Sequence, residues 1–292
     1  GQQMVQVKTW GKTKRALSFM QKRAIDIIML VVAVFWLIPT VGLFVQSLRT
    51  GADIGQSGWW TALANPRTLT LNSYIRLLSE PTMLRALKNT FIITIPSTVF
   101  VVGIAALAAY ALAWIPFKGR EALFLVIVGL QVVPTQMAFI PAAQIFRLMG
   151  IFGTVQGVIL FHLAFGLPFA IFLLRNFLGN VPRALLEAAQ MDGAGHLLMF
   201  WRILLPLAMP AIASLSIFQF LWVWNDMMIA LIFAEPVNAP LTTAIFSQMR
   251  NFASNVDVIA PGAFLQMLVP LIIFFLFQRQ LVQGILGGSI KD

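Results

Sequence analysis

Two groups of polar residues stand out in a chain that is otherwise strongly apolar. The first is the segment from Glu187 to Pro206, where the carboxylates of Glu187 and Asp192 stand among alanines and glycines. Small side chains let another backbone approach closely, and carboxylates attract a basic partner, so this chemistry is that of a docking surface. The second group ends an apolar run and consists of Gln219, Trp222, Asn225 and Asp226. An indole face can pack against a sugar ring while amide and carboxylate groups bind its hydroxyls.

The second group predicts a substrate pathway. At 100° per residue Gln219, Trp222 and Asp226 share one helix face, and Asn225 borders it. Polar side chains inside a membrane usually face the interior of a helix bundle, which favours a lining role, with Gln131 as a further candidate. An alternative for Asn225 and Asp226 is a place at the outer membrane interface, because they end the apolar run.

Other chemistries are poorly supported. The chain has no cysteine, which excludes disulfides and thiolate metal sites, and its two histidines, His162 and His196, are far apart. A membrane enzyme or a zinc site is therefore a poor alternative, and His162 is expected to be a hydrogen-bonding residue within the bundle. Trp224 is expected to pack or to anchor in lipid. The residues around Lys12 lack the glycine pattern of a phosphate loop, so no nucleotide cofactor is expected in this chain.

The polar groups must be positioned by membrane-spanning helices. The chain has 292 residues, of which 59% are hydrophobic and 10% charged, against about 25% charged in a typical soluble domain. Six runs free of charged residues are long enough to cross a bilayer: Ile27–Gln46, Phe91–Ile115, Ala122–Phe146, Leu148–Leu174, Ile203–Asn225 and Val258–Gln278. Strand alternation is absent, and helices satisfy their own backbone in lipid. The predicted fold class is therefore all-α, a polytopic membrane bundle of six transmembrane helices.

The basic residues predict how these spans are oriented. The net charge is +10, and thirteen of the twenty Lys and Arg residues lie on one side of a six-span topology. The positive-inside rule makes that side cytoplasmic, so the charge is an insertion signal and no nucleic-acid partner is expected. Residues 1–23 are predicted to be a basic cytoplasmic segment, 24–283 the membrane domain and 284–292 a cytoplasmic tail. The loop 49–86 is expected outside and the loop 179–205 inside.

Local signals predict the shape of several connecting segments. Asn180 and Pro182 favour the start of a short helix near Arg183, which would lie parallel to the membrane. Gly193 can adopt a bend that a branched residue could not. Prolines within the apolar runs, such as Pro134, are expected to bend their helices. Residues 72–78 have helical spacing and are expected along the outer surface.

The inner loop carries a family pattern. Its residues Glu187-Ala188-Ala189, Asp192-Gly193-Ala194 and Ile203-Leu204-Leu205-Pro206 closely resemble the EAA loop of ABC importer permeases. Three other segments look like carbohydrate-uptake permeases of the maltose type: Val181-Pro182, Trp224-Asn225-Asp226 and Phe277–Gly284. The resemblance covers nearly the whole chain after residue 24, and the short six-span form is similar to the smaller of two paired permease subunits.

This resemblance implies a set of partners and a mechanism. It implies a heterodimer with a second, homologous permease, two cytoplasmic ATPase subunits that bind ATP and Mg²⁺, and an extracytoplasmic solute-binding protein that delivers a sugar. The complex would sit in a bacterial or archaeal inner membrane with both termini of this chain cytoplasmic, and would work by alternating access. The residues implied in the ATPase contact are Glu187, Ala188, Ala189, Asp192, Gly193 and Ala194. The run Gly58-Trp59-Trp60 is similar to α-glucoside permeases.

Two alternatives of the transporter class stay open. An ion-coupled secondary transporter would need no ATPase and would typically have more spans and inverted repeats. An ABC importer for another solute, such as a peptide, would share the inner loop. Dependence of uptake on ATP or on an ion gradient separates the first alternative from the resemblance.

Overall fold

The described part of the chain is helical throughout. The computed structural model describes residues 2–249 and 252–287, with side chains for residues 21–249 and 255–280, and it contains no strand there beyond one isolated bridge between Gly153 and Ala234. The longest elements are α1 (Gln2–Ser47), α5 (Pro81–Trp114), α8 (Val155–Gly179), α11 (Leu205–Trp224) and α14 (Phe252–Gly287). The expected all-α fold is confirmed.

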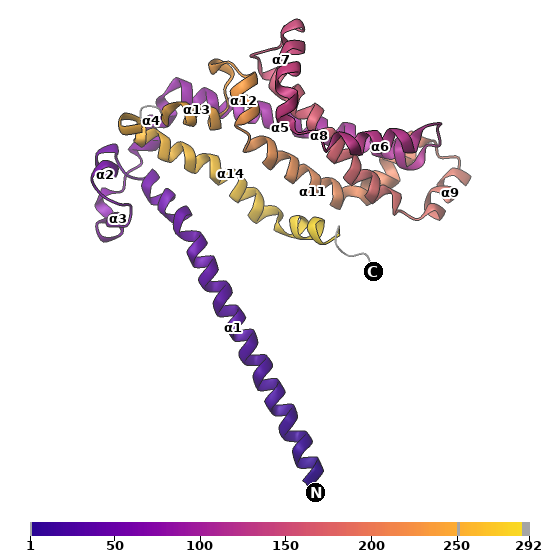
Figure 1. The fold of residues 1–292 in the computed structure, drawn as a ribbon, viewed down its shortest axis with the longest axis horizontal. Coiled ribbons are helices and arrows are strands. Elements are labelled where there is room, and N and C mark those ends of the chain that lie inside the picture. The colour runs from indigo at the N-terminus through magenta and orange to yellow at the C-terminus, as the bar shows by residue number, and fades with distance from the viewer. Residues whose placement is uncertain (1, 250–251, 288–292) are drawn as a thin grey trace.

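Shorter elements connect these long helices (Figure 1). Between α1 and α5 lie α2 (Gly51–Gln56), α3 (Thr61–Ala64), η1 (Pro66–Thr68) and α4 (Asn72–Ser79). Between α5 and α8 lie α6 (Arg120–Leu130), η2 (Thr135–Ala138) and α7 (Phe139–Leu148). Between α8 and α11 lie α9 (Arg183–Met191), α10 (His196–Met199) and the π-helical turn η3 (Phe200–Leu204). Between α11 and α14 lie α12 (Met228–Phe233), η4 (Pro236–Asn238) and α13 (Leu241–Gln248).

The third predicted span is broken. The sequence predicts one span over Ala122–Phe146, but the structure has two arms, Arg120–Leu130 and Thr135–Leu148, which meet at 96°. Pro134 has no N–H to continue the backbone ladder and sits in extended conformation between the arms. The described residues therefore contain five helices long and apolar enough to cross a membrane, or six if the two arms form one span. In Figure 1, α7 stands steeply against α6.

Two other boundaries differ from the sequence prediction. Helix α5 begins at Pro81, ten residues before the apolar run, because Glu80 caps it through a 2.7 Å hydrogen bond from the Met83 N–H. Charged residues can extend a membrane helix beyond the bilayer, so the loop predicted at 49–86 ends inside this helix. Helix α8 begins at Val155 and not near Leu148, because Gly150 and Gly153 adopt φ of 71° and 83° and form a turn.

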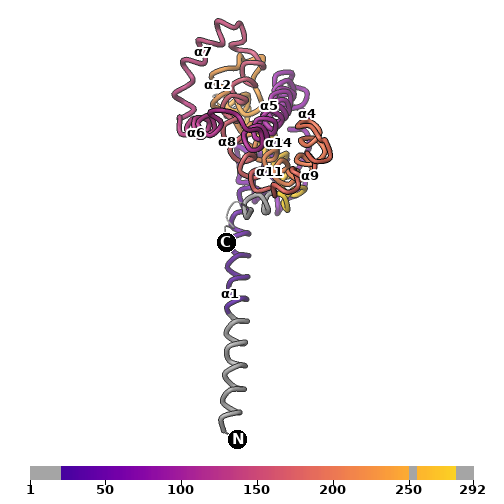
Figure 2. Tube along the Cα trace, turned by 90° about the vertical axis from the view of Figure 1, so that its right-hand side faces the viewer, coloured from indigo at the N-terminus to yellow at the C-terminus, as the bar shows by residue number. Residues whose placement is uncertain are grey.

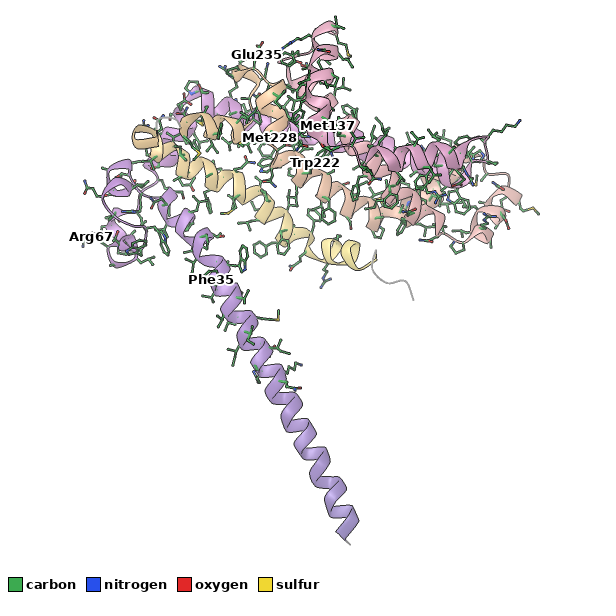
Figure 3. All side chains as sticks on the ribbon, viewed as in Figure 1. Phe35, Arg67, Met137, Trp222, Met228 and Glu235 are labelled. Carbon is green, nitrogen blue, oxygen red and sulfur yellow. The ribbon has the colours of Figure 1, made fainter. Side chains whose placement is uncertain are left out.

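The core of the bundle lies where α5 packs along α8 and α11. Ala105, Ala109 and Ala170 are fully buried there, and their small side chains let the helix backbones approach closely. Figure 2 shows these helices gathered together while α1 runs away from them. Among residues 21–47 of α1, burial within the chain is concentrated near the C-terminal end, where Phe44 packs against Phe264 of α14 with ring centroids 5.1 Å apart. Phe35, labelled in Figure 3, is 70% exposed on the uncovered part.

Gly166 sets the distance between α8 and its neighbours. A Cβ atom at this position would lie 2.9 Å from the Gln219 amide nitrogen and 3.1 Å from a Val101 methyl group. Gly166→Leu is expected to lower the free energy of unfolding by about 1–3 kcal/mol, because overpacking forces helices apart. Thermal unfolding of the purified protein in lipid nanodiscs measures the effect. The matched control is Gly103→Leu on α5, where a Cβ meets nothing within 4 Å, and equal loss of stability in both variants would contradict the packing argument.

Polar contacts tie the loops together at the end of the bundle that carries α4. Arg76 and Asp257 form an ion pair between α4 and α14, and the Asn89 amide donates to the carbonyls of Val237 and Ala239 at 3.0 and 3.1 Å. The Tyr74 hydroxyl lies 2.7 Å from Ser47 Oγ, and burial raises the pKa of Tyr74, with the Ser47 hydrogen bond opposing the rise. The helix predicted at 72–78 is therefore present as α4 and joins α1 to the bundle.

Candidate functional site

Residues 179–195, which connect α8 to α10 and are called the knob below, form a compact projection at the other end of the bundle. The predicted short helix is present as α9, from Arg183 to Met191. Its end is a Schellman motif: the Ala194 N–H donates to the Ala189 carbonyl at 2.9 Å, and the Gly193 N–H donates to the Gln190 carbonyl at 2.9 Å. Gly193 adopts φ of 82°, so the predicted bend is present and has a specific structural cause.

The start of α9 differs from the prediction. Asn180 is the C-terminal cap of α8, so it does not cap α9, and Pro182 immediately precedes the new helix. Val181 bridges the two helices and its N–H donates to the Leu178 carbonyl at 3.3 Å. The connection between α8 and α9 is therefore a tight turn, in which the cap of one helix is followed almost at once by the start of the next.

One face of α9 packs inward. Leu186 is 4% exposed within the main core, and Ala189 and Ala194 are half-buried against the same core. Ala189 and Ala194, which the resemblance assigns to a partner contact, thus contact this chain's own helices. Their place in a partner contact remains a prediction.

The opposite face of the knob is exposed. Glu187, Ala188, Asp192 and Gly193 all lie on it. Large apolar side chains are exposed nearby, with Met191 on α9 exposed by 89% and Leu197 on α10, just after the knob, by 70%. Exposed apolar residues clustered next to carboxylates are typical of a surface that a protein partner covers.

The shape of this knob depends on Gly193. Gly193→Val is expected to weaken the knob by roughly 1–2 kcal/mol, because a β-branched residue is strained at positive φ. A Cβ at this position meets nothing within 4 Å, so the cost comes from the backbone and not from a clash. Limited proteolysis of the 179–195 segment in nanodiscs measures the loss as faster cleavage. Gly195→Ala is the matched control, since Gly195 has an ordinary φ of −75°; equally fast cleavage in the control would contradict the assignment.

Two aromatic residues of α5 hold the ends of the knob, and the sequence pattern did not single them out. The Tyr110 hydroxyl lies 2.8 Å from His196 Nδ1 after the knob, and the Trp114 indole N–H donates to the Leu178 carbonyl at 3.1 Å before it. The Tyr110 ring also packs edge-on against Phe200 with centroids 5.5 Å apart. Their signal in the sequence is two aromatics spaced four residues apart at the end of a span.

The residues predicted to line a pathway do not share one helix face in the structure. Helix α11 ends at Trp224, so Asp226 lies beyond the helix face on which the sequence placed it. Gln219 is 5% exposed, and its amide nitrogen has no hydrogen-bond partner and faces Gly166 of α8. Gln219 thus lies between helices in this chain, and its lining role remains a prediction.

Trp222 and Asp226 meet at His162. The His162 ring packs perpendicular to the Trp222 indole with centroids 5.3 Å apart, and its Nε2 lies 3.6 Å from Asp226 Oδ2. Asp226 also accepts hydrogen bonds from the N–H groups of Ile229 and Ala230, at 3.3 and 3.2 Å, and so caps the start of α12. Trp222 is 40% exposed beside this cluster, and Figure 3 shows it near Met228 at the junction of α11 and α12.

The remaining candidates lie around the cluster. Asn225 is exposed and its amide donates to the Leu221 carbonyl at 2.9 Å. Gln131 is exposed at the end of α6, where the third span breaks. Trp224 is fully buried and its indole donates to the Gln266 carbonyl at 2.8 Å, so its expected packing role agrees with its place. Within the described side chains, no three His, Asp or Glu residues lie together as ligands for a metal.

Apolar helices long enough to span a membrane, a broken span and an exposed knob at one end are the features of a multi-pass membrane protein. The family model described as "Binding-protein-dependent transport system inner membrane component" matches residues 101–287. The chain belongs to this family, and it is a multi-pass permease of the ABC importer type.

Individual relatives agree with the family. The chain is 43% identical over 287 residues to the osmoprotective compounds uptake permease protein GgtD of Synechocystis sp., covering 97% of this chain and 96% of that protein. It is also 43% identical over 254 residues to the alpha-glucoside transport system permease protein AglG of Rhizobium meliloti, covering 85% of this chain and 67% of that protein.

A solved structure agrees with the fold. A bacterial ABC transporter involved in import of the acidic polysaccharide alginate superposes with a TM-score of 0.73 at 20% identity, covering 87% of this chain and 94% of that chain. At this identity the likeness concerns the fold alone, and it extends over nearly all of the bundle.

Proposed function

We propose that this chain is one of two permease subunits in an ATP-driven importer of glucosides, and that it forms half of the translocation pathway. The observation that carries the proposal is the knob at 179–195, which is helical, exposed, partly apolar and joined to the bundle at both ends. A protein partner bound to this exposed segment could displace it and, through both connections, the helices of the bundle. The relatives, which are named as uptake permeases for osmoprotective compounds and alpha-glucosides, support the substrate class.

In this proposal the partner at the knob is an ATPase subunit. Glu187 and Asp192 would face basic residues of the ATPase, while Met191 and Leu197 lose their exposed apolar surface on docking. ATP and Mg²⁺ are bound by the ATPase pair, so this chain supplies no catalytic group. Closure of the ATPases moves the knob, and the helices attached to it alternate between outward-open and inward-open arrangements. Such coupling requires different knob contacts in the two states.

The opposite end of the bundle would receive the solute. With the knob in the cytoplasm, the loops tied by Arg76, Asp257 and Asn89 face outward, where a solute-binding protein docks. Both termini of this chain are then cytoplasmic, as the distribution of basic residues favours. A second, homologous permease would cover the apolar surface that this chain leaves open and complete the pathway.

Trp222 and Asp226 are proposed to contact the sugar as it passes. Trp222 presents a half-exposed indole face, and the Asp226 carboxylate and Asn225 amide offer groups for hydroxyls. Gln131 and Gln219 are placed on the same pathway in this proposal. The preference for α-glucosides rests on the relatives and on the run Gly58-Trp59-Trp60, in which Trp60 is 63% exposed at the outward end.

Reconstitution tests the proposal. The permease pair, the ATPases and the binding protein are purified together, and the binding protein is screened by thermal shift against maltose, sucrose, trehalose, a glucosylated polyol and a dipeptide. Uptake of the strongest ligand into proteoliposomes is then measured with internal or external ATP, and separately with an ion gradient. Uptake of a glucoside driven only by ATP is expected. Uptake driven by an ion gradient without ATP would overturn the transport mechanism, and a dipeptide as the strongest ligand would overturn the substrate class.

A further inference from the structure

The last turns of α5 hold both ends of the knob at once. Trp114 donates to the Leu178 carbonyl, the last buried residue of α8 before the knob, at 3.1 Å. One helical turn earlier, the Tyr110 hydroxyl contacts His196 Nδ1 at 2.8 Å, at the first residue after the knob. Residues Tyr110 and Trp114 are four apart and therefore lie on the same face of α5.

We propose that Tyr110 and Trp114 are positioning residues that make α5 move with the knob. Helices α8 and α11 are joined to the knob by the chain itself, but α5 reaches it only through noncovalent contacts. Helix α5 also packs along α8 and α11 within the core, and the two contacts extend this coupling to its last turns. Without them, the last turns of α5 would no longer follow a displaced knob closely. This inference rests on the proposed function, because it assigns a role to α5 in transmitting ATPase motion.

The segment that follows the knob, which Tyr110 contacts, contains a π-helical turn. His196 begins α10, which continues into the π-helical turn Phe200–Leu204. A π-turn has a wider ring than an α-turn, and such turns occur frequently at functional sites. Phe200 is 4% exposed and its ring packs against Tyr110, so α5 contacts the first residue of this turn as well as His196. The contact therefore fixes the spacing between α5 and the start of α11.

The rest of α5 is suited to carry the motion inward. Ala105, Ala106 and Ala109 are buried against neighbouring helices just above the two contacts. Such close packing resists sliding of one helix along another, because densely packed side chains are hard to compress and transmit strain to their neighbours. A shift of the last turns of α5 would therefore move the whole helix.

The test separates ATP hydrolysis from transport in the assembled complex. Tyr110→Phe keeps the ring and removes the hydroxyl contact, and Trp114→Phe keeps an aromatic ring and removes the indole N–H donor. Tyr110 is only 5% exposed, so its substitution cannot alter the docking surface directly. The expected result is a fall of about three- to tenfold in substrate transported per ATP hydrolysed, with ATPase activity retained, since one hydrogen bond is removed. His196→Asn, whose amide can replace the contact at Nδ1, is expected to restore most of the ratio lost in His196→Leu.

The chain offers matched controls. Tyr74 is its only other tyrosine, and its hydroxyl bonds Ser47 at the opposite end of the bundle. Trp224 likewise donates to a backbone carbonyl away from the knob. Tyr74→Phe and Trp224→Phe are expected to leave the transport ratio within about twofold of the parent, because each removes a comparable bond elsewhere. A ratio in Tyr110→Phe and Trp114→Phe equal to that of the controls would overturn the inference.

A distance measurement gives a second answer that does not depend on activity. The chain has no cysteine, so Arg85→Cys on α5 and Arg183→Cys at the start of α9 carry spin labels specifically. If α5 and the knob move together, the distance between the labels stays the same with and without ATP in the parent complex and changes in Tyr110→Phe. A parent distance that changes with ATP would overturn the inference. A parent complex that shows no ATP-driven uptake would instead overturn the proposed function.

Discussion

Glu187→Lys is expected to lower ATP-driven uptake at least tenfold, to about the level of a complex without ATPase, while the isolated ATPases keep their hydrolytic activity. Glu187 is exposed on α9, next to Met191 and on the face that does not pack against the core. Placing a lysine opposite a basic partner brings like charges together in an interface that excludes water, which costs several kcal/mol. Copurification of the ATPases with the permease pair and uptake into proteoliposomes measure the two consequences.

The charge-neutral variant separates charge from shape at this position. Glu187→Gln keeps the length of the side chain and removes the repulsion, so an intermediate loss is expected. Arg67, in η1 among the loops at the opposite end of the bundle, serves as the control position, because Arg67→Gln removes an exposed charge away from α9. Normal uptake and normal copurification in Glu187→Lys would show that α9 does not seat the ATPase.

Asp226→Ala is expected to lower both stability and uptake. Its carboxylate caps α12 through two backbone N–H groups, and its Oδ2 lies 3.6 Å from Nε2 of buried His162. Loss of the cap costs about 1 kcal/mol, and a buried polar group left without a partner costs about 1–3 kcal/mol. A drop of roughly 2–4 kcal/mol in the free energy of unfolding is therefore expected from the sum of the two terms.

A double-mutant cycle shows how much of this loss passes through His162. His162→Phe fills the same space beside Trp222 without a polar nitrogen, and it is combined with Asp226→Ala. If the two residues act together, the double variant is expected to be more stable than the sum of the single losses by about 0.5–3 kcal/mol. Thermal unfolding in nanodiscs measures the change in unfolding free energy of each variant, and glucoside uptake measures how far each variant loses transport. Strict additivity would mean that Asp226 acts on α12 alone.

The fold class could be read from composition because a membrane leaves few choices. Charged residues are scarce over long runs, and only a helix satisfies its backbone there, so five of the predicted spans correspond to long apolar helices, of which α14 is kinked at Phe277. The third did not, because hydropathy reports where a helix can be buried and not whether its axis is straight. Pro134 signalled a bend, but its angle of 96° depends on how the two arms pack against their neighbours.

The docking segment could also be predicted, since its pattern is local. A helix near Arg183 and a bend at Gly193 follow from backbone preferences that act within a few residues. Which face of that helix is free does not follow in the same way. Ala189 and Ala194 turned out to pack against the core, because the crossing of α5, α8 and α11 decides which side of α9 is covered.

The sequence by itself determined the class of the chain, its spans and the short helix that presents Glu187, because hydropathy, charge and local backbone preference are encoded residue by residue. The tertiary structure alone decided the contacts among distant residues: His162 with Asp226 and Trp222, and Tyr110 with His196. Those pairs are separated by many residues along the chain and meet only when helices pack at particular angles. Their energies depend on that packing, so no local pattern could reveal them.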